Sequence, residues 1–399
     1  MKDFTDKDTL LYECHHESLA QRRLARLRLQ PRLSVKRCAV LLIFALLGGG
    51  CGHTITEPIA PPQPFDTARV RIVVPEVYEL ANIIIALTDY GLRDPYRVLQ
   101  TTDYYQRMRA AFSPHVEHSS LKQLQLGGGD PLRQYYEFRE NSFSYVFDGG
   151  QVSRQRDYGT IWNPNRFRER LGAVQKFADA SPFRAFYQSS QPYYRELIAR
   201  YRELVQVDSL ADWLEREFAP RRFDFYTVVL SPLVYASHSS QTVRTAHGTE
   251  ALMFVSGPEV TSTGVSAGVG QAMLQRVLFT EIDHSFVNPV TDQYRTDVER
   301  AFGQRAKWTT DASTFYQSPL AVFNEYMTWA VFILFIDGRL SAEDFAEVVR
   351  RTESQMEGSR RFQRFGAFNQ ELLGLYRGRA SGQRVPNLYP AIIDWAGRQ

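Results

Sequence analysis

Residues 278–289 read Leu-Phe-Thr-Glu-Ile-Asp-His-Ser-Phe-Val-Asn-Pro and hold the strongest fold signal in the chain. In this stretch and just before it, apolar side chains recur three and four residues apart. This spacing predicts a helix over residues 268–286, because side chains at i, i+3 and i+4 share one helix face. Asn288-Pro289 is expected to end that helix.

A second, strongly apolar helix is predicted over residues 317–337. Asn324 and Glu325 interrupt its apolar run, so a buried core helix fits the pattern better than a membrane span. A carboxylate is costly to bury unless it is paired, hydrogen-bonded or bound to a metal. Glu325 therefore requires a partner, and His284 is the obvious candidate.

Short strands are expected beside these helices, and the rest of the chain has mostly helical patterns. The strand candidates are Val70–Val74, a strand and turn in Phe143–Val152, Phe223–Leu230 and Ala251–Val255. A polar loop, Ser231–Thr249, is expected between the last two strands. The predicted fold class is α+β and predominantly helical, with a small β-sheet beside the pair of apolar helices.

Glu281 and His284 occupy the second and last positions of the His-Glu-x-x-His pattern of zinc hydrolases. In that pattern two His side chains one turn apart bind zinc, and the Glu acts as general base on the metal-bound water. The first ligand position holds Thr280, whose neutral hydroxyl is a poor zinc ligand. Glu325 is the candidate for a third ligand from the second helix.

Three segments resemble an uncharacterised bacterial family known only as domain of unknown function 4932. They are residues 74–82, the aromatic-rich residues 183–194, and residues 281–289. The likeness spans roughly residues 70–345 and implies a zincin-like metallopeptidase core. The family pattern implies His-Glu-x-x-His followed by Ser-Phe-Val-Asn-Pro, which Glu281 and His284 match and from which Thr280 departs.

Three arrangements of these residues stay open. In the first, His284 and Glu325 bind zinc with a ligand from elsewhere, such as His238 or His247, and Glu281 is the base. In the second, Glu281 is itself a ligand and Asp283 takes the base role. In the third, no metal binds, and Glu281, His284 and Glu325 form a buried polar network.

Tyr235 and His238, which follow the predicted strand Phe223–Leu230, are further candidates for the substrate cleft. His238 lies where a zincin-like fold would line that cleft. Tyr235 is a candidate for polarising a substrate carbonyl.

The N-terminal sequence is typical of export. The apolar run Cys38–Leu47 follows Lys36-Arg37 and precedes Gly48-Gly49-Gly50-Cys51, which predicts a signal segment over residues 1–50. The segment resembles a bacterial lipobox, so we expect cleavage before Cys51 and lipid attachment to it. The long polar stretch at residues 1–34 suggests that translation starts downstream of Met1.

The remaining chain is divided by composition. Residues 51–68 are rich in Pro and small polar residues, as in a tether, and precede a metallopeptidase-like domain at 69–385 and a C-terminal tail at 386–399. Residues 1–50 carry nine basic and five acidic side chains, so removing them changes the net charge from +3 to −1. This gives no electrostatic reason to expect a nucleic-acid partner.

These patterns predict a lipid-anchored protein of the cell envelope that faces the periplasm or the exterior. The expected activity is zinc-dependent hydrolysis of a peptide or protein, with Glu281 as base. The alternative is a catalytically inactive, zincin-like protein that binds a peptide or protein partner through the same cleft.

Overall fold

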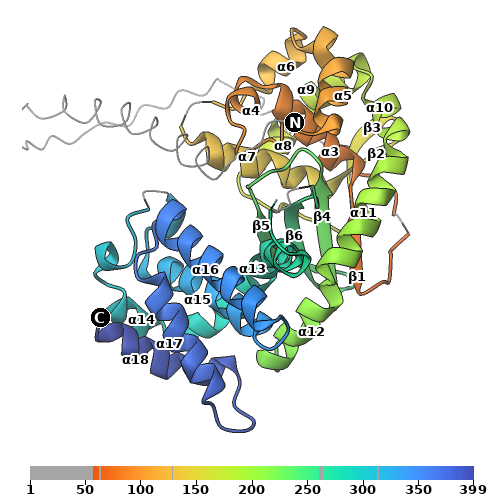
Figure 1. Cartoon of the computed structure of the whole chain (residues 1–399). Helices are drawn as coiled ribbons and strands as arrows, with labels where there is room; N and C mark the ends of the chain where they lie inside the picture. Colours follow the sequence, from red (N-terminus) through yellow and green to blue (C-terminus); the bar gives the residue numbers. More distant parts are fainter. Residues whose placement is uncertain (1–56, 63, 128, 260–263, 312–313) are drawn as a thin grey trace, which may run out of the picture. The chain divides into compact units, whose positions relative to one another are not determined.

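Four strands form the central sheet of the computed structural model, in the order β1-β4-β6-β5 (Figure 1). Strands β1 (Val70–Val73), β4 (Phe225–Ser231) and β6 (Gly248–Ser256) are parallel, and β5 (Ser239–Thr245) runs antiparallel to β6 at one edge. The structure describes residues 57–62, 64–127, 129–259, 264–311 and 314–399.

Helices surround this sheet, so the fold is α+β and predominantly helical, as predicted. The helices that precede β4 are α3 (Glu76–Leu87), α4 (Asp89–Arg93), α5 (Asp103–Phe112), α6 (Ser119–Gln123), α7 (Pro131–Arg139), α8 (Arg166–Glu169), α9 (Leu171–Ala180), α10 (Phe183–Ser189), α11 (Gln191–Val205) and α12 (Val207–Glu217). Those after β6 are α13 (Ala267–Gln293), α14 (Arg295–Ala301), α15 (Pro319–Ile336), α16 (Ala342–Ser354), α17 (Phe365–Arg377) and α18 (Tyr389–Gly397). A separate hairpin joins β2 (Tyr145–Asp148) and β3 (Gln151–Arg154).

Both faces of the central sheet are covered by helices, and side chains alternate between the faces. On one face Phe254 packs with Tyr78 of α3, with ring centroids 5.6 Å apart, and Val229 belongs to the same cluster. The other face lies against α13, where the hydroxyl groups of Thr242 and Ser285 are 3.1 Å apart. The sheet therefore lies between α3 and α13.

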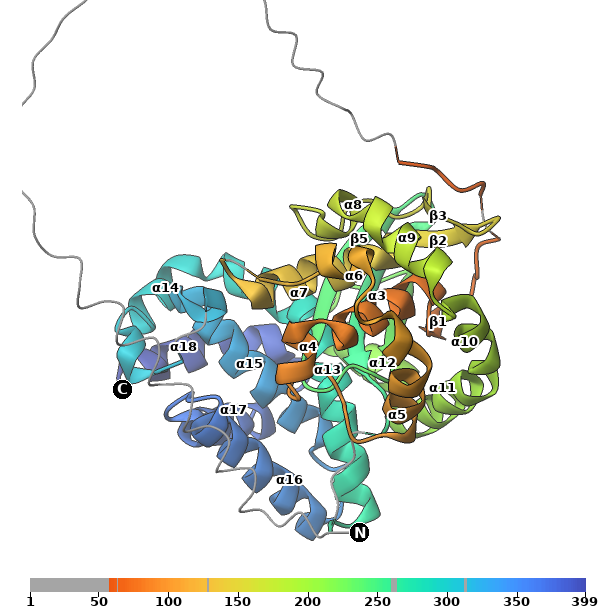
Figure 2. The same cartoon turned by 90° about the horizontal axis from the view of Figure 1, so that it is seen from above.

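Helices α13 and α15 pack against each other between the sheet and the C-terminal helices (Figure 2). The ring of Phe279 on α13 lies 5.6 Å from Phe332 and 5.1 Å from Phe335 on α15. Among the described residues, α15 is the one helix long and apolar enough to cross a membrane, yet 83% of it is buried inside the fold. Helix α15 thus has the core position that the sequence predicts.

Two secondary-structure predictions are wrong: one segment predicted as a loop contains a strand, and one helix ends later than predicted. The segment predicted as a polar loop, residues 231–249, contains β5, whose Ser, Gln, Thr and Arg side chains lack apolar alternation because β5 is a half-exposed edge strand. Helix α13 continues through Pro289 to Gln293, although proline removes the bond to the Ser285 carbonyl. Buried Val287 and Thr291 on either side of Pro289 hold the helix in place.

The ends of the folded unit also differ from the predicted division. Residues 57–60, assigned to the tether, pack against β3, where Glu57 pairs with Arg154 at 2.9 Å. The segment assigned to a C-terminal tail forms α18, which packs against α14 and α17 with Tyr389 and Ile392 fully buried. Cys51 and the predicted signal segment lie outside the described residues.

Candidate functional site

A cavity of about 610 Å³ lies where α13, α15 and the start of β5 meet. Five of the residues singled out from the sequence line it: His238, Thr280, Glu281, His284 and Glu325. Three others do not line it: Asp283, Tyr235 and His247. The structure therefore brings five of the candidate residues to one cavity and places the other three outside its lining.

Helix α13 supplies a polar stripe to this cavity. Arg276, Thr280, His284 and Asn288 recur every four residues, and all four side chains line the cavity. This spacing places them one above another on one helix face. Glu281 lies beside the stripe and lines the same space.

Thr280 directs its hydroxyl at its own helix. The hydroxyl donates to the Arg276 carbonyl at 3.0 Å, a bond that Ser and Thr side chains often make within helices. The side chain is buried. Thr280, which the sequence comparison set at the first ligand position of the His-Glu-x-x-His pattern, therefore bonds to its own helix.

Glu325 projects from α15 toward α13 and meets two nitrogen donors. Its side chain is 6% exposed, and Oε1 accepts hydrogen bonds from Trp329 Nε1 at 2.8 Å and from the Arg360 guanidinium. The other oxygen, Oε2, lies 3.9 Å from Nε2 of His284. The structure thus brings Glu325 and His284 together, but a guanidinium is the closest charged partner of Glu325.

The two other His candidates have partners of their own. His238 Nε2 lies 2.9 Å from the Tyr235 carbonyl and 3.2 Å from the Ser256 hydroxyl. Burial lowers the pKa of His238 to about 4, so the ring is neutral at ordinary pH. His247 stacks on Phe65, with ring centroids 3.7 Å apart, at the far end of β5.

These residues do not fit a catalytic zinc. Such a zinc takes three protein ligands and one open position. The described part of the chain holds no group of three or more His, Cys, Asp or Glu side chains placed to share a metal. At the positions in question Thr280 bonds to its helix and Glu325 is paired with Arg360, which leaves His284 and one carboxylate oxygen.

Glu281 has an altered proton affinity. Burial, and then the nearby charge of Glu325, raise the pKa of Glu281 to about 8, while Arg360 acts in the opposite direction. Glu140 and Arg139 are the other charged groups that act on it. Glu281 therefore keeps its proton at neutral pH and faces the cavity as a hydrogen-bond donor.

Glu281→Gln is expected to raise the free energy of unfolding by about 1 to 3 kcal/mol at pH 8.5 and to change it little at pH 4.5. A carboxyl with a raised pKa destabilises the fold as pH rises above its unfolded value of about 4.3. The loss in the free energy of unfolding is complete once the pH exceeds the pKa that Glu281 has in the folded protein. Urea unfolding of both proteins at each pH measures the difference, and an effect independent of pH would contradict this assignment.

Asp283 lies in the core instead of the cavity. Neither of its carboxyl oxygens has a hydrogen-bond partner among the described residues, and the side chain is fully buried. Burial, followed by the charge of Glu281, raises the pKa of Asp283 well above its usual range. Asp283 is therefore not placed to act as a base on a ligand in the cavity.

Arg276, Trp329 and Arg360 are among the cavity residues that the sequence analysis missed. Arg276 precedes Thr280 by four residues, so the predicted helix already contained the signal for it. Trp329 follows Glu325 by the same spacing. Arg360 comes from the turn after α16, and no pattern in the sequence connects that turn to the cavity.

Comparison with protein families gives one match. The model described as Domain of unknown function (DUF4932) matches residues 147–393, which is more than half of the chain. The chain belongs to this family. The matched range contains two of the three segments on which the resemblance was based, 183–194 and 281–289. It does not contain residues 74–82, and it continues beyond residue 345, the expected end, to residue 393. No curated protein and no solved structure matches the chain.

Proposed function

We propose that the cavity and the adjacent edge strand bind an extended segment of a peptide or protein without a bound metal. The observation that carries this proposal is the position of β5. It is the edge strand of the central sheet and pairs only with β6 among the described strands. Its first residues, Ser239, Ser240 and Gln241, line the cavity.

An edge strand offers unpaired backbone N–H and C=O groups to a ligand. An extended peptide can add to such an edge through main-chain hydrogen bonds, while pockets beside it select side chains. Here the cavity is the pocket beside the edge. The side chains of β5 are polar or half-exposed, so the edge is not sealed by apolar packing.

The arrangement also supports a zincin-like origin of the fold. Helix α13 carries Glu281 and His284, α15 carries Glu325, and an antiparallel edge strand lies beside them. In this proposal the chain keeps the cleft of a peptidase but lacks its metal ligands. The ligand is then envelope or extracellular material, because the N-terminal sequence favours export and a lipid anchor at Cys51.

Binding of an extended peptide is expected to slow hydrogen–deuterium exchange at residues 239–245 by about tenfold or more. A panel of unstructured heptapeptides is screened by fluorescence polarisation, and exchange is measured with the tightest binder. Strand β1, at the opposite edge of the same sheet, is the matched control and should not change. Protection confined to other segments, or no binding by any peptide of the panel, would contradict the proposal.

The second candidate function is zinc-dependent peptide hydrolysis. One observation favours it: Nε2 of His284 and Oε2 of Glu325 are 3.9 Å apart, and both residues line the cavity. This candidate requires a third ligand that the described residues do not supply. Cleavage of a fluorogenic peptide library that is abolished by chelator and restored by zinc would establish it.

A further inference from the structure

Arg276 is a buried cation in the wall of the cavity. Its side chain belongs to the polar stripe of α13, and the residue is only 6% exposed. A charge removed from water is costly unless an opposite charge compensates it. The partners of Arg276 therefore decide whether its positive charge is compensated within the protein.

The hydrogen-bond partners of Arg276 are neutral. Nη2 donates to the Gln355 side-chain oxygen at 2.5 Å, and Nη1 donates to the Thr352 hydroxyl at 3.4 Å. Among the described residues, the charged group that acts on Arg276 is another cation, Arg360, and no carboxylate is among the causes of its pKa shift. Burial, and then the charge of Arg360, lower the pKa of Arg276 to about 9, as expected for an uncompensated cation.

Two guanidinium groups share the ring of Trp329. The central carbon of Arg276 lies 4.5 Å from the ring centroid, and that of Arg360 lies 4.9 Å from it. Stacking on an aromatic ring holds a guanidinium in a fixed plane. The two donors are thus oriented before any ligand arrives.

Charges around this ring do not balance. Arg360 pairs with Glu325 and also donates to the Tyr316 hydroxyl at 2.6 Å, while its Nε lacks a partner among the described residues. The two guanidinium groups at the Trp329 ring therefore have one carboxylate partner between them, Glu325, and it pairs with Arg360 and not with Arg276.

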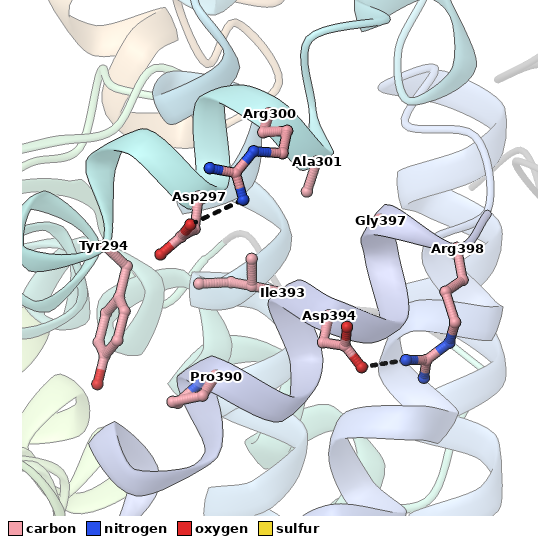
Figure 3. A pocket seen from close by; sticks show the side chains of 9 residues that line it. All are labelled: Tyr294, Asp297, Arg300, Ala301, Pro390, Ile393, Asp394, Gly397 and Arg398. Atoms are coloured by element: carbon pink, nitrogen blue, oxygen red, sulfur yellow. Dashed lines mark hydrogen bonds and ion pairs between the residues drawn. The ribbon is translucent and has the colours of Figure 1, made fainter.

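In a second cavity, by contrast, each arginine is paired with a carboxylate. It has a volume of about 410 Å³ and lies between α14 and α18 (Figure 3). Arg300 pairs with Asp297 at 3.1 Å, and Arg398 pairs with Asp394. Each arginine there has its own carboxylate, so that cavity has no unmatched charge to offer a ligand.

We propose that Arg276, with Arg360 beside it, forms a subsite for a carboxylate group of the ligand. A guanidinium binds a carboxylate through two parallel N–H···O bonds, which adds direction as well as charge. This inference rests on the proposed function, because it names the chemical class of peptide that the cleft prefers. The carboxylate comes from either a free peptide C-terminus or an Asp or Glu side chain.

Four versions of the tightest-binding peptide separate these sources. Two lack acidic side chains and have either a free or an amidated C-terminus, so they test the terminal carboxylate. The other two are amidated and carry either Glu or Gln at one position, so they test a side-chain carboxylate. The version with the preferred carboxylate is expected to bind the wild-type chain about 10- to 100-fold more tightly than its neutral counterpart. In Arg276→Gln this preference should disappear, while the affinity for the neutral peptides stays the same. Arg300→Gln, which changes an arginine of the second cavity, should retain the preference.

Equal binding of charged and neutral peptides by the wild-type chain would overturn the inference, as would a preference retained in Arg276→Gln. Thermal unfolding shows that the variant is folded, and Arg276→Lys, which keeps the charge but not the paired donors, should keep part of the preference. If no peptide binds the wild-type chain, the proposed function fails and the subsite is tested with glutarate alone. Glutarate should then raise the melting temperature of the wild-type chain and not of Arg276→Gln; no such difference would overturn the subsite as well.

Discussion

Thr280→His is expected to give the chain about one bound zinc per molecule. The substitution places an imidazole four residues before His284, so that two imidazoles and the carboxylate of Glu325 face one point between α13 and α15. Zinc at 100 times its Kd should then stabilise the fold by about 2.7 kcal/mol. Elemental analysis and thermal unfolding with and without zinc measure the two effects.

Two further variants sharpen this result. Thr280→Val removes the hydroxyl without adding a ligand, so it should remain free of zinc. Arg360 holds Glu325 in the present chain, so Arg360→Gln combined with Thr280→His should bind zinc more tightly than Thr280→His alone. If Thr280→His takes up no zinc in either background, the cleft does not have the metallopeptidase geometry that we propose for its origin.

Arg360→Gln is expected to lower the free energy of unfolding by about 2 to 4 kcal/mol. The change leaves the Glu325 carboxylate, whose side chain is 6% exposed, with the Trp329 N–H as its remaining strong donor. Removing one partner of a buried ion pair is costly because the other charge stays behind without compensation. The partial exposure of Arg360, at 27%, keeps the effect below that of a fully buried pair.

Urea unfolding of the single and double variants tests this account. Glu325→Gln together with Arg360→Gln should recover at least half of the loss, since the buried charge is then gone. Arg377→Gln breaks an exposed pair with Asp337 and should cost less than about 1 kcal/mol. A cost for Arg360→Gln as small as that of Arg377→Gln would show that Glu325 does not depend on its guanidinium partner.

Much of the framework could be predicted because it depends on apolar periodicity. Helices α13 and α15 and strands β4 and β6 carry long apolar patterns, and each contains most or all of its predicted segment, although α13 continues past its predicted end. Glu325 was also recognised from the sequence, because a carboxylate in an apolar helix requires a partner. These features are local, so a single segment contains the information for each.

The errors have a common physical origin. Strand β5 is held by backbone pairing to β6, and its side chains are polar, so its own sequence does not identify it. Arg360 reaches Glu325 from 35 positions further along the chain, across the turn after α16. The sequence analysis named His284 as the partner of Glu325, and the structure places the two 3.9 Å apart. It did not predict the guanidinium of Arg360, which no local pattern reveals.

These two errors change the chemistry expected of the site. With β5 the cavity has an edge to which a polypeptide can add. With Arg276 and Arg360 it has fixed positive charge near the place where the sequence suggested a metal ion. Both changes favour recognition of a ligand over hydrolysis.

The zinc content of the wild-type chain, purified without chelator, tests the central claim most directly. A cleft that works through guanidinium groups should contain far less than one zinc per molecule, and His284→Ala should leave that content unchanged. Near-stoichiometric zinc that disappears in His284→Ala would contradict the account and restore the metallopeptidase interpretation.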